Sequence, residues 1–252
     1  MATLPLSEFL TYSACGFGAQ MVGGSLGMAY GVCSTTFLLT AGMPLVSASA
    51  AVHASGLFTT GASGLSHLRF RNIDRFLLRH LLPAGMIGGA AGAALLARIP
   101  GRGIKVAVSF YLVLMGVLIL RRAVRPSDPA ASSPASRLVP MGLAGGFLDA
   151  MGGGGWGVFV ASSLLAHGCP PRFVVGTVNL CKFFVNVAAS AVFFSLLGVP
   201  DLAAVAGLVS GGVVAAPIAA WACGRIPHRP MMFMAGILVV GVSLRNLFRS
   251  LG

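Results

Sequence analysis

Charged residues are scarce in this sequence, and acidic residues are the scarcest. Only 9% of the 252 residues are charged, whereas a soluble domain carries about 25%. So few charges cannot cover a water-facing surface. The acids number only five (Glu8, Asp74, Asp128, Asp149 and Asp201), which argues against an enzyme with paired carboxylates and against a carboxylate-rich path for cations or protons.

Signatures of metal, cofactor and nucleophile chemistry are missing as well. The cysteines (Cys15, Cys33, Cys169, Cys181 and Cys223) form no CxxC pair, and their odd number suits no zinc site. No HExxH, GxSxG or P-loop lysine motif is present, and the dinucleotide-like glycine spacing after residue 151 follows no strand. We therefore expect no enzyme activity, no cofactor and no metal.

The chain consists instead of long, continuously apolar runs. It is 56% hydrophobic, with a mean hydropathy of +0.91. Runs of about 20 residues are long enough to cross a hydrocarbon core as helices, and they lack the alternation of a bacterial β-barrel. We predict an all-α transmembrane bundle of about eight segments. They fall at 9–40, 46–68, 80–97, 103–120, 138–168, 173–197, 201–223 and 230–248.

The net charge of +12 does not indicate nucleic-acid binding. Most Arg and Lys residues lie between the apolar runs, where the positive-inside rule places them. The first ten residues contain Glu8 and no basic residue, which argues against a secretory signal peptide. We expect a multi-pass membrane protein whose partners include the lipid bilayer, with a homodimer left open as its assembly.

Two halves of the chain match at a shift of 126 residues. The stretch from Gly27 to Val32 lies on that from Gly153 to Val158, and Pro44 lies on Pro170. We predict a first repeat at 1–122, a polar basic connector at 123–137 and a second repeat at 138–252. Internal duplication recurs in secondary transporters, whose binding sites lie at the repeat interface near the midplane.

Each half opens with a glycine-heavy segment that we expect to break. A run of four glycines, 152–155, costs a helix about 1 kcal/mol per residue relative to Ala. Broken backbone at membrane depth persists where it lines a cavity or packs against protein. The predicted binding residues in these two openings are Gly27, Tyr30, Gly153, Gly154, Gly155 and Trp156.

Two topologies remain open. If every segment spans, the repeats are parallel and both termini are cytoplasmic. If 9–40 and 138–168 are re-entrant, each half crosses three times and the repeats are inverted. The basic stretches do not decide between the two.

Lys182 lies near the middle of an apolar segment, where a charge costs about 3 kcal/mol. Asn179 and Asn186 share its helix face, because they lie three residues before it and four after. This arrangement predicts an anion site with one positive charge and two amides. The alternatives are a lysine that reaches the interface, or one paired with Asp149.

The corresponding helix of the first half has His53 where the second has Asn179, with Ser55, Thr59 and Thr60 nearby. His53 could bind an anion or exchange a proton, although a histidine in an apolar run is more often a packed side chain. Asp149 is the one acid within an apolar segment. It is either a proton carrier or cation partner, or a structural cap beside the glycines.

At these residues the chain resembles the TauE/SafE family of sulfite and organosulfonate exporters. The resemblance spans about Gly16 to Phe248. It is carried by the glycine-rich openings, by Ala48 to His53 and Thr59 to His67 before a basic loop with Asn72 and Asp74, by Gly146 to Gly157, and by Val175 to Leu180 with Phe183 to Val185. The resemblance implies a bacterial cytoplasmic-membrane transporter of sulfur oxyanions, sulfonates or small organic acids.

One departure from the family pattern concerns the predicted anion site. Close members tend to carry a glutamate three residues after the His53 and Asn179 positions, where this chain has Gly56 and Lys182. We hypothesise that this makes the centre more positive and shifts coupling away from carboxylate-borne protons, or changes the anion selected. The function predicted is a secondary carrier of sulfite or an organosulfonate. Alternatives are an anion channel, a structural membrane subunit and a carrier of a small carboxylate.

Overall fold

The computed structural model describes residues 6–99, 101–124, 135–153, 155–167, 169–223, 225 and 228–251, which form helices and no strand. Most of the predicted connector and the predicted site residue Gly154 lie outside these ranges. The elements are α1 (Leu6–Leu26), α2 (Tyr30–Thr40), α3 (Leu45–Arg69), α4 (Arg75–Arg98), α5 (Gly101–Val124), α6 (Ala135–Gly152), the π-helix η1 (Trp156–Ala161), α7 (Ser162–Ala166), α8 (Pro171–Leu197), α9 (Leu202–Ala222) and α10 (His228–Leu251).

The first glycine-rich segment folds into a helical hairpin. Helix α1 ends at Leu26, and the chain reverses through Gly27 and Ala29, whose φ angles are 71° and 75°. Helix α2 then returns beside α1, where the rings of Tyr12 and Phe37 lie 5.9 Å apart, edge to face. Residues 9–40 therefore do not form a single spanning helix.

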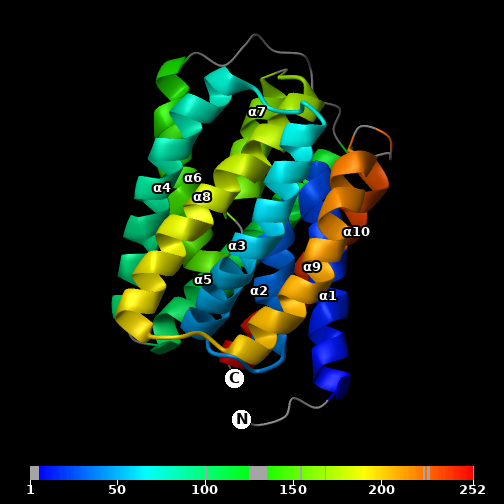
Figure 1. Cartoon of the computed structure of the whole chain (residues 1–252). Coiled ribbons are helices and arrows are strands. Elements are labelled where there is room, and N and C mark those ends of the chain that lie inside the picture. The colour runs from blue at the N-terminus through cyan, green and yellow to red at the C-terminus, as the bar shows by residue number, and fades with distance from the viewer. Residues whose placement is uncertain are drawn as a thin grey trace.

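The second glycine-rich segment makes the same reversal. Gly153 takes a φ of 71°, equal to that of Gly27, and η1 returns along α6 before α7 continues from it. A side chain at Gly145 would meet Val160 at 2.5 Å, which shows how closely the two arms pack. The two hairpins point toward each other from opposite ends of the bundle (Figure 1). This arrangement agrees with the re-entrant alternative rather than with a span in each segment.

Each hairpin packs on a helix from the other half of the chain. Helix α1 packs along α9, α6 packs along α4, and α3 and α8 cross at the centre. Helices α3 and α8 both follow a proline, Pro44 or Pro170, and α4 and α9 are both capped by an aspartate, Asp74 or Asp201, which accepts two backbone N–H bonds. Equivalent elements thus make equivalent contacts, although the duplication itself stays a prediction.

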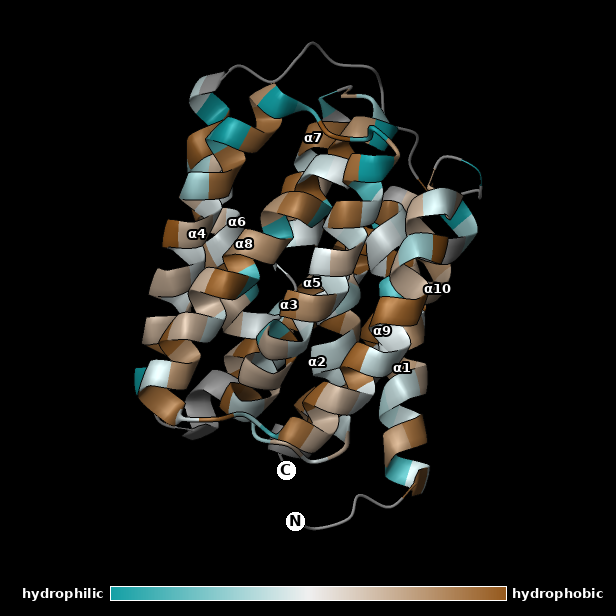
Figure 2. Cartoon of the chain, viewed as in Figure 1, coloured by the Kyte–Doolittle hydropathy of each residue, from teal (hydrophilic) through white to brown (hydrophobic). Residues whose placement is uncertain are grey.

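The outside of the bundle is apolar along its sides and polar at its ends. Phe58, Leu65, Ile87 and Val214 are each more than half exposed, and hydrophilic residues gather at the ends (Figure 2). Among the described residues, α4, α8 and α9 are long and apolar enough to cross a membrane. The predicted count of eight spans is not confirmed.

The hairpin tips meet at glycines. A side chain at Gly31 would collide with the carbonyl oxygen of Gly153, and one at Gly157 would lie 2.5 Å from the carbonyl oxygen of Gly27. These contacts are reciprocal, because Gly27 and Gly31 correspond to Gly153 and Gly157 at the 126-residue shift. Reciprocity of this kind is the signature of a twofold axis.

The close approach of the tips leads to a prediction. Gly31→Ala should lower the midpoint of thermal unfolding in detergent, because overpacking costs about 1–3 kcal/mol. Gly18→Ala is the matched control on α1, since nothing lies within 4 Å of its added methyl group. The control should keep or raise the midpoint. Equal midpoints for the two variants would contradict the tip-to-tip contact.

Candidate functional site

A small cavity lies where the two hairpin tips meet α3 and α8. Its volume is about 30 Å³, room for about two water molecules at 10–15 Å³ each. It combines backbone from both chain reversals with polar side chains from α3, α6 and α8. Its lining residues are Gly23, Gly27, Met28, Ala29, Tyr30, Gly31, Thr60, Asp149, Gly153, Trp156, Gly157, Val178, Asn179 and Lys182.

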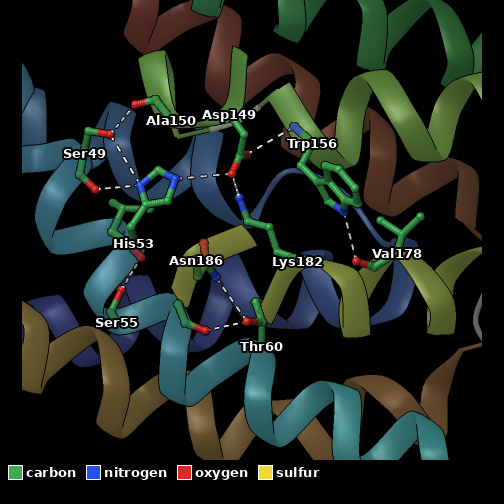
Figure 3. Close-up of polar contacts among 12 residues, drawn as sticks. Ser49, His53, Ser55, Thr60, Asp149, Ala150, Trp156, Val178, Lys182 and Asn186 are labelled. Atoms are coloured by element: carbon green, nitrogen blue, oxygen red, sulfur yellow. Dashed lines mark hydrogen bonds and ion pairs between the residues drawn. The ribbon is translucent and has the colours of Figure 1, made fainter. Parts of the chain in front are cut away.

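The central interaction is a buried ion pair between Lys182 of α8 and Asp149 of α6. The Lys182 Nζ donates to Asp149 Oδ2, and the two residues are 8% and 1% exposed. The other carboxylate oxygen, Oδ1, accepts the backbone N–H of Trp156 at 3.2 Å, at the start of η1 (Figure 3). Asp149 is thus both a cation partner and a cap of the broken segment. Of the alternatives for Lys182, the structure shows the pairing with Asp149, and the anion site stays a prediction.

His53 lies on the other side of the same carboxylate. Its Nε2 is 3.3 Å from Asp149 Oδ2, and its Nδ1 is 2.8 Å from the carbonyl oxygen of Ser49. A carbonyl only accepts, so Nδ1 carries a hydrogen. A hydrogen bond from Nε2 to Asp149 therefore needs one further proton, either on the imidazole or on the carboxyl group. The geometry provides a place for a proton shared by His53 and Asp149.

The two asparagines on the Lys182 face of α8 form hydrogen bonds to helices α1 and α3. Asn179 donates to the carbonyl oxygen of Gly23, 3.3 Å away on α1, and Asn186 donates to Thr60 Oγ1 at 3.1 Å. Asn186 and Thr60 are counterparts at the 126-residue shift, and a residue meets its own counterpart on a twofold axis. Both asparagines are almost fully buried.

Other predicted residues lie close to the cavity without lining it. Ser55 bonds the hydroxyl of Tyr30 at 2.9 Å, and the buried Thr59 hydroxyl has no hydrogen-bond partner among the described residues. Gly155 packs against the backbone of Asp149. Trp156, by contrast, does line the cavity; it is fully buried and donates its indole N–H to the carbonyl oxygen of Val178 at 3.0 Å.

Some contributors were missed from the sequence. Ser49 holds His53 through its carbonyl and donates its hydroxyl to the carbonyl oxygen of Ala150 at 2.7 Å. Gly31 and Gly157 line the cavity as the second residues of α2 and η1. Helix N-termini favour anions, and both of these N-termini lie at the cavity. Only the position of Ser49, one helical turn before His53, could have indicated its role.

Comparison with known proteins assigns the chain to a family. Residues 12–246 match the family described as "Sulfite exporter TauE/SafE". The chain belongs to the TauE/SafE family. It is 39% identical over 250 residues to "Probable membrane transporter protein YtnM" of Bacillus subtilis (strain 168), an alignment that covers 96% of this chain and 83% of the relative. No solved structure matches the chain.

This TauE/SafE protein is therefore an integral membrane transporter, and its apolar helices suit membrane crossing. The ion pair is buried inside the bundle. A charge left there without its partner is costly, so the pair is a strong constraint on the surrounding helices. No group of three His, Cys, Asp or Glu side chains in the described part of the chain could hold a metal ion.

The ion pair can be tested by a double-mutant cycle in this TauE/SafE protein. Lys182→Met or Asp149→Asn alone should lower the free energy of unfolding by about 3–5 kcal/mol, because each leaves a buried charge or its partner unmatched. The double variant should recover much of that loss. Thermal unfolding in detergent gives the comparison. Additive losses in the double variant would contradict the pairing.

Proposed function

We propose that this protein carries a small anion, foremost sulfite or an organosulfonate, which binds to Lys182 at the hairpin tips. The observation that carries the proposal is the buried Lys182 ammonium group at a cavity bordered by the N-termini of α2 and η1. An ammonium group and helix N–H donors suit the negative oxygens of a sulfur oxyanion. The family description, which names sulfite exporters, supports the same substrate class.

An incoming anion has to displace the carboxylate of Asp149 from Lys182. A buried carboxylate that loses its cation costs several kcal/mol unless it takes up a proton. His53 lies 3.3 Å from the oxygen that would be freed. The pair of Lys182 and ionised Asp149 has no net charge. The site again has no net charge when Lys182 binds a monovalent anion and Asp149 is protonated. Anion binding and proton uptake are therefore coupled. Among the described residues, Tyr111 of α5 is a further ionisable group near Asp149, and its ring lies against Gly152.

The hairpins provide the moving parts. A cavity of about 30 Å³ is too small for a sulfonate, so the tips must separate before the anion reaches Lys182. Two inverted repeats supply two related conformations in which the site opens to one side and then to the other. The reciprocal contacts of the tip glycines support this inverted duplication.

The charge distribution supports one orientation. Helices α3, α5 and α9 finish and α4, α6, α8 and α10 begin at one end of the bundle (Figure 1). Most of the described arginines lie at this end, which faces the cytoplasm under the positive-inside rule. Helix α1 starts and α10 finishes at the opposite end, on the outer side of a bacterial cytoplasmic membrane. The described arginines at the cytoplasmic end are Arg69, Arg71, Arg75, Arg79, Arg121, Arg137, Arg172, Arg225 and Arg229.

A small carboxylate is the second candidate substrate. The Lys182 ammonium already holds a carboxylate, that of Asp149. A carboxylate substrate would replace it with little change in bonding.

Transport in proteoliposomes tests the proposal. Wild-type affinity for sulfite or methanesulfonate should rise as pH falls, by up to about tenfold per pH unit for one coupled proton. Asp149→Asn should bind the anion without this pH dependence, because the lysine is already released from its carboxylate. Lys182→Met should abolish saturable transport.

Asp201→Asn is the matched control for the coupling carboxylate. Asp201 caps α9 at the far end of the bundle from the basic loops, and Asn is an equally good cap. This variant should keep wild-type transport and its pH dependence. Retained transport in Lys182→Met would overturn the proposed site. Uptake that never saturates would indicate a channel instead of a carrier.

A further inference from the structure

A second, larger cavity lies at the basic end of the bundle. Its volume is about 350 Å³, within the usual range for small-ligand pockets of about 300–1,000 Å³. It opens between the loop after α3, the start of α8 and the end of α9. Its lining residues are Phe70, Asn72, Arg172, Ala220, Cys223 and Arg225.

The charge of this cavity is positive. Among the described residues that line it are two guanidinium groups, those of Arg172 and Arg225, and no carboxylate. Burial raises the pKa of the Cys223 thiol to about 11, although Arg172 acts against this, so the thiol is neutral. The nearby Asp74 is occupied as the cap of α4. A small anion is therefore the ligand that this cavity suits.

Both arginines are held in place. The Arg172 Nε donates to Asn72 Oδ1, and its Nη2 donates to the carbonyl oxygen of Phe70 at 2.7 Å. Arg225 lies 4.8 Å from the ring centre of Trp221 and donates to the Trp221 carbonyl oxygen at 2.5 Å. Fixed guanidinium groups lose little conformational freedom when they bind an oxyanion.

Asn72 is itself part of a chain of hydrogen bonds that runs inward. It is 3% exposed, and its amide donates to His67 Nδ1 at 3.1 Å. His67 Nε2 then donates at 3.0 Å to the carbonyl oxygen of Gly24, near the tip of the first hairpin. This chain orients Arg172 from within the bundle, so the arginine belongs to a built site rather than to a loose surface patch.

We propose that this cavity, at the cytoplasmic end of the bundle, is a peripheral binding site, called the outer site below, at which a small oxyanion or sulfonate docks between Arg172 and Arg225 on its way to or from Lys182. The inference rests on the proposed anion transport. Arg172 and Lys182 are both on α8, nearly three turns apart, or about 15 Å by helical rise. An anion at the outer site is thus close enough to reach the centre when the hairpin tips separate.

The two tryptophans of the chain make the two sites separately observable. Trp221 lies against Arg225 at the outer cavity, and Trp156 lines the central one. In a Trp156→Phe background, Trp221 fluorescence should change saturably with methanesulfonate. Arg172→Gln should raise the half-saturating concentration at least about tenfold. In an otherwise wild-type protein, Arg172→Gln should raise the KM of transport with little change in maximal rate.

Arg79→Gln is the matched control. Arg79 is on α4 near the same end of the bundle, but its guanidinium lies over Phe76, 5.0 Å from the ring centre, and does not line the cavity. This variant should leave both the Trp221 response and the KM unchanged. A KM in Arg172→Gln equal to that in Arg79→Gln would overturn the outer site.

The same measurements separate this inference from the proposed function. If Trp156 responds in a Trp221→Phe background and Trp221 stays silent, the central site stands and the outer site falls. A silent Trp156 with a saturable Trp221 response supports the outer site and overturns the central one.

A lipid headgroup is an alternative occupant of the cavity. Nanodiscs of phosphatidylcholine with and without phosphatidylglycerol test whether an anionic lipid binds there. If phosphatidylglycerol alone produces the Trp221 change and methanesulfonate cannot compete, the occupant is a lipid headgroup and the proposal fails.

Discussion

The buried ion pair between Lys182 and Asp149 is the interaction on which the rest of this structure depends. Lys182 belongs to the long helix α8, whereas Asp149 lies three residues before the end of α6, beside the reversal of the second hairpin. The pair therefore fixes a hairpin tip to the central helices. Because neither charge is stable alone in an apolar interior, the tip can leave only if another charge, or a proton, takes the place of the missing partner. The site therefore stays closed as long as the two charges neutralise each other.

Glycine makes this closure possible at the level of the backbone. The reversals need left-handed φ angles at Gly27 and Gly153, and the crossing of the tips needs Gly31 and Gly157, which have no side chain to separate the two backbones. Glycine weakens helices, so these segments are poor spanning helices and good hairpins. The polar backbone groups exposed at the reversals are then available to a cavity between the halves.

Much of the central cavity could be predicted from the sequence. A charged residue within an apolar segment needs a partner or a polar cavity, and a run of glycines in such a segment indicates a break in the helix. Lys182, Asp149, Trp156 and the tip glycines come together as those arguments required. The sequence did not decide between a spanning segment and a hairpin, since both place the same residues in apolar surroundings. It also could not show that Lys182 is neutralised, because Asp149 is 33 residues away along the chain and only the reversal at Gly153 brings it near. Arg172 resembled any basic residue at a helix start until its bond to the buried Asn72 was seen.

The number of charges at the centre limits what the site can carry. Among the described residues that line the cavity, Lys182 is the one permanent cation, and its present partner is a single carboxylate. A monovalent anion can replace that partner without changing the net charge, provided that Asp149 takes up one proton. A divalent anion would leave one negative charge unmatched unless His53, next to Asp149, were also protonated. Because an unmatched buried charge costs several kcal/mol, the proposed anion transport would favour monovalent sulfonates and singly charged oxyanions, and a divalent anion would need a second proton.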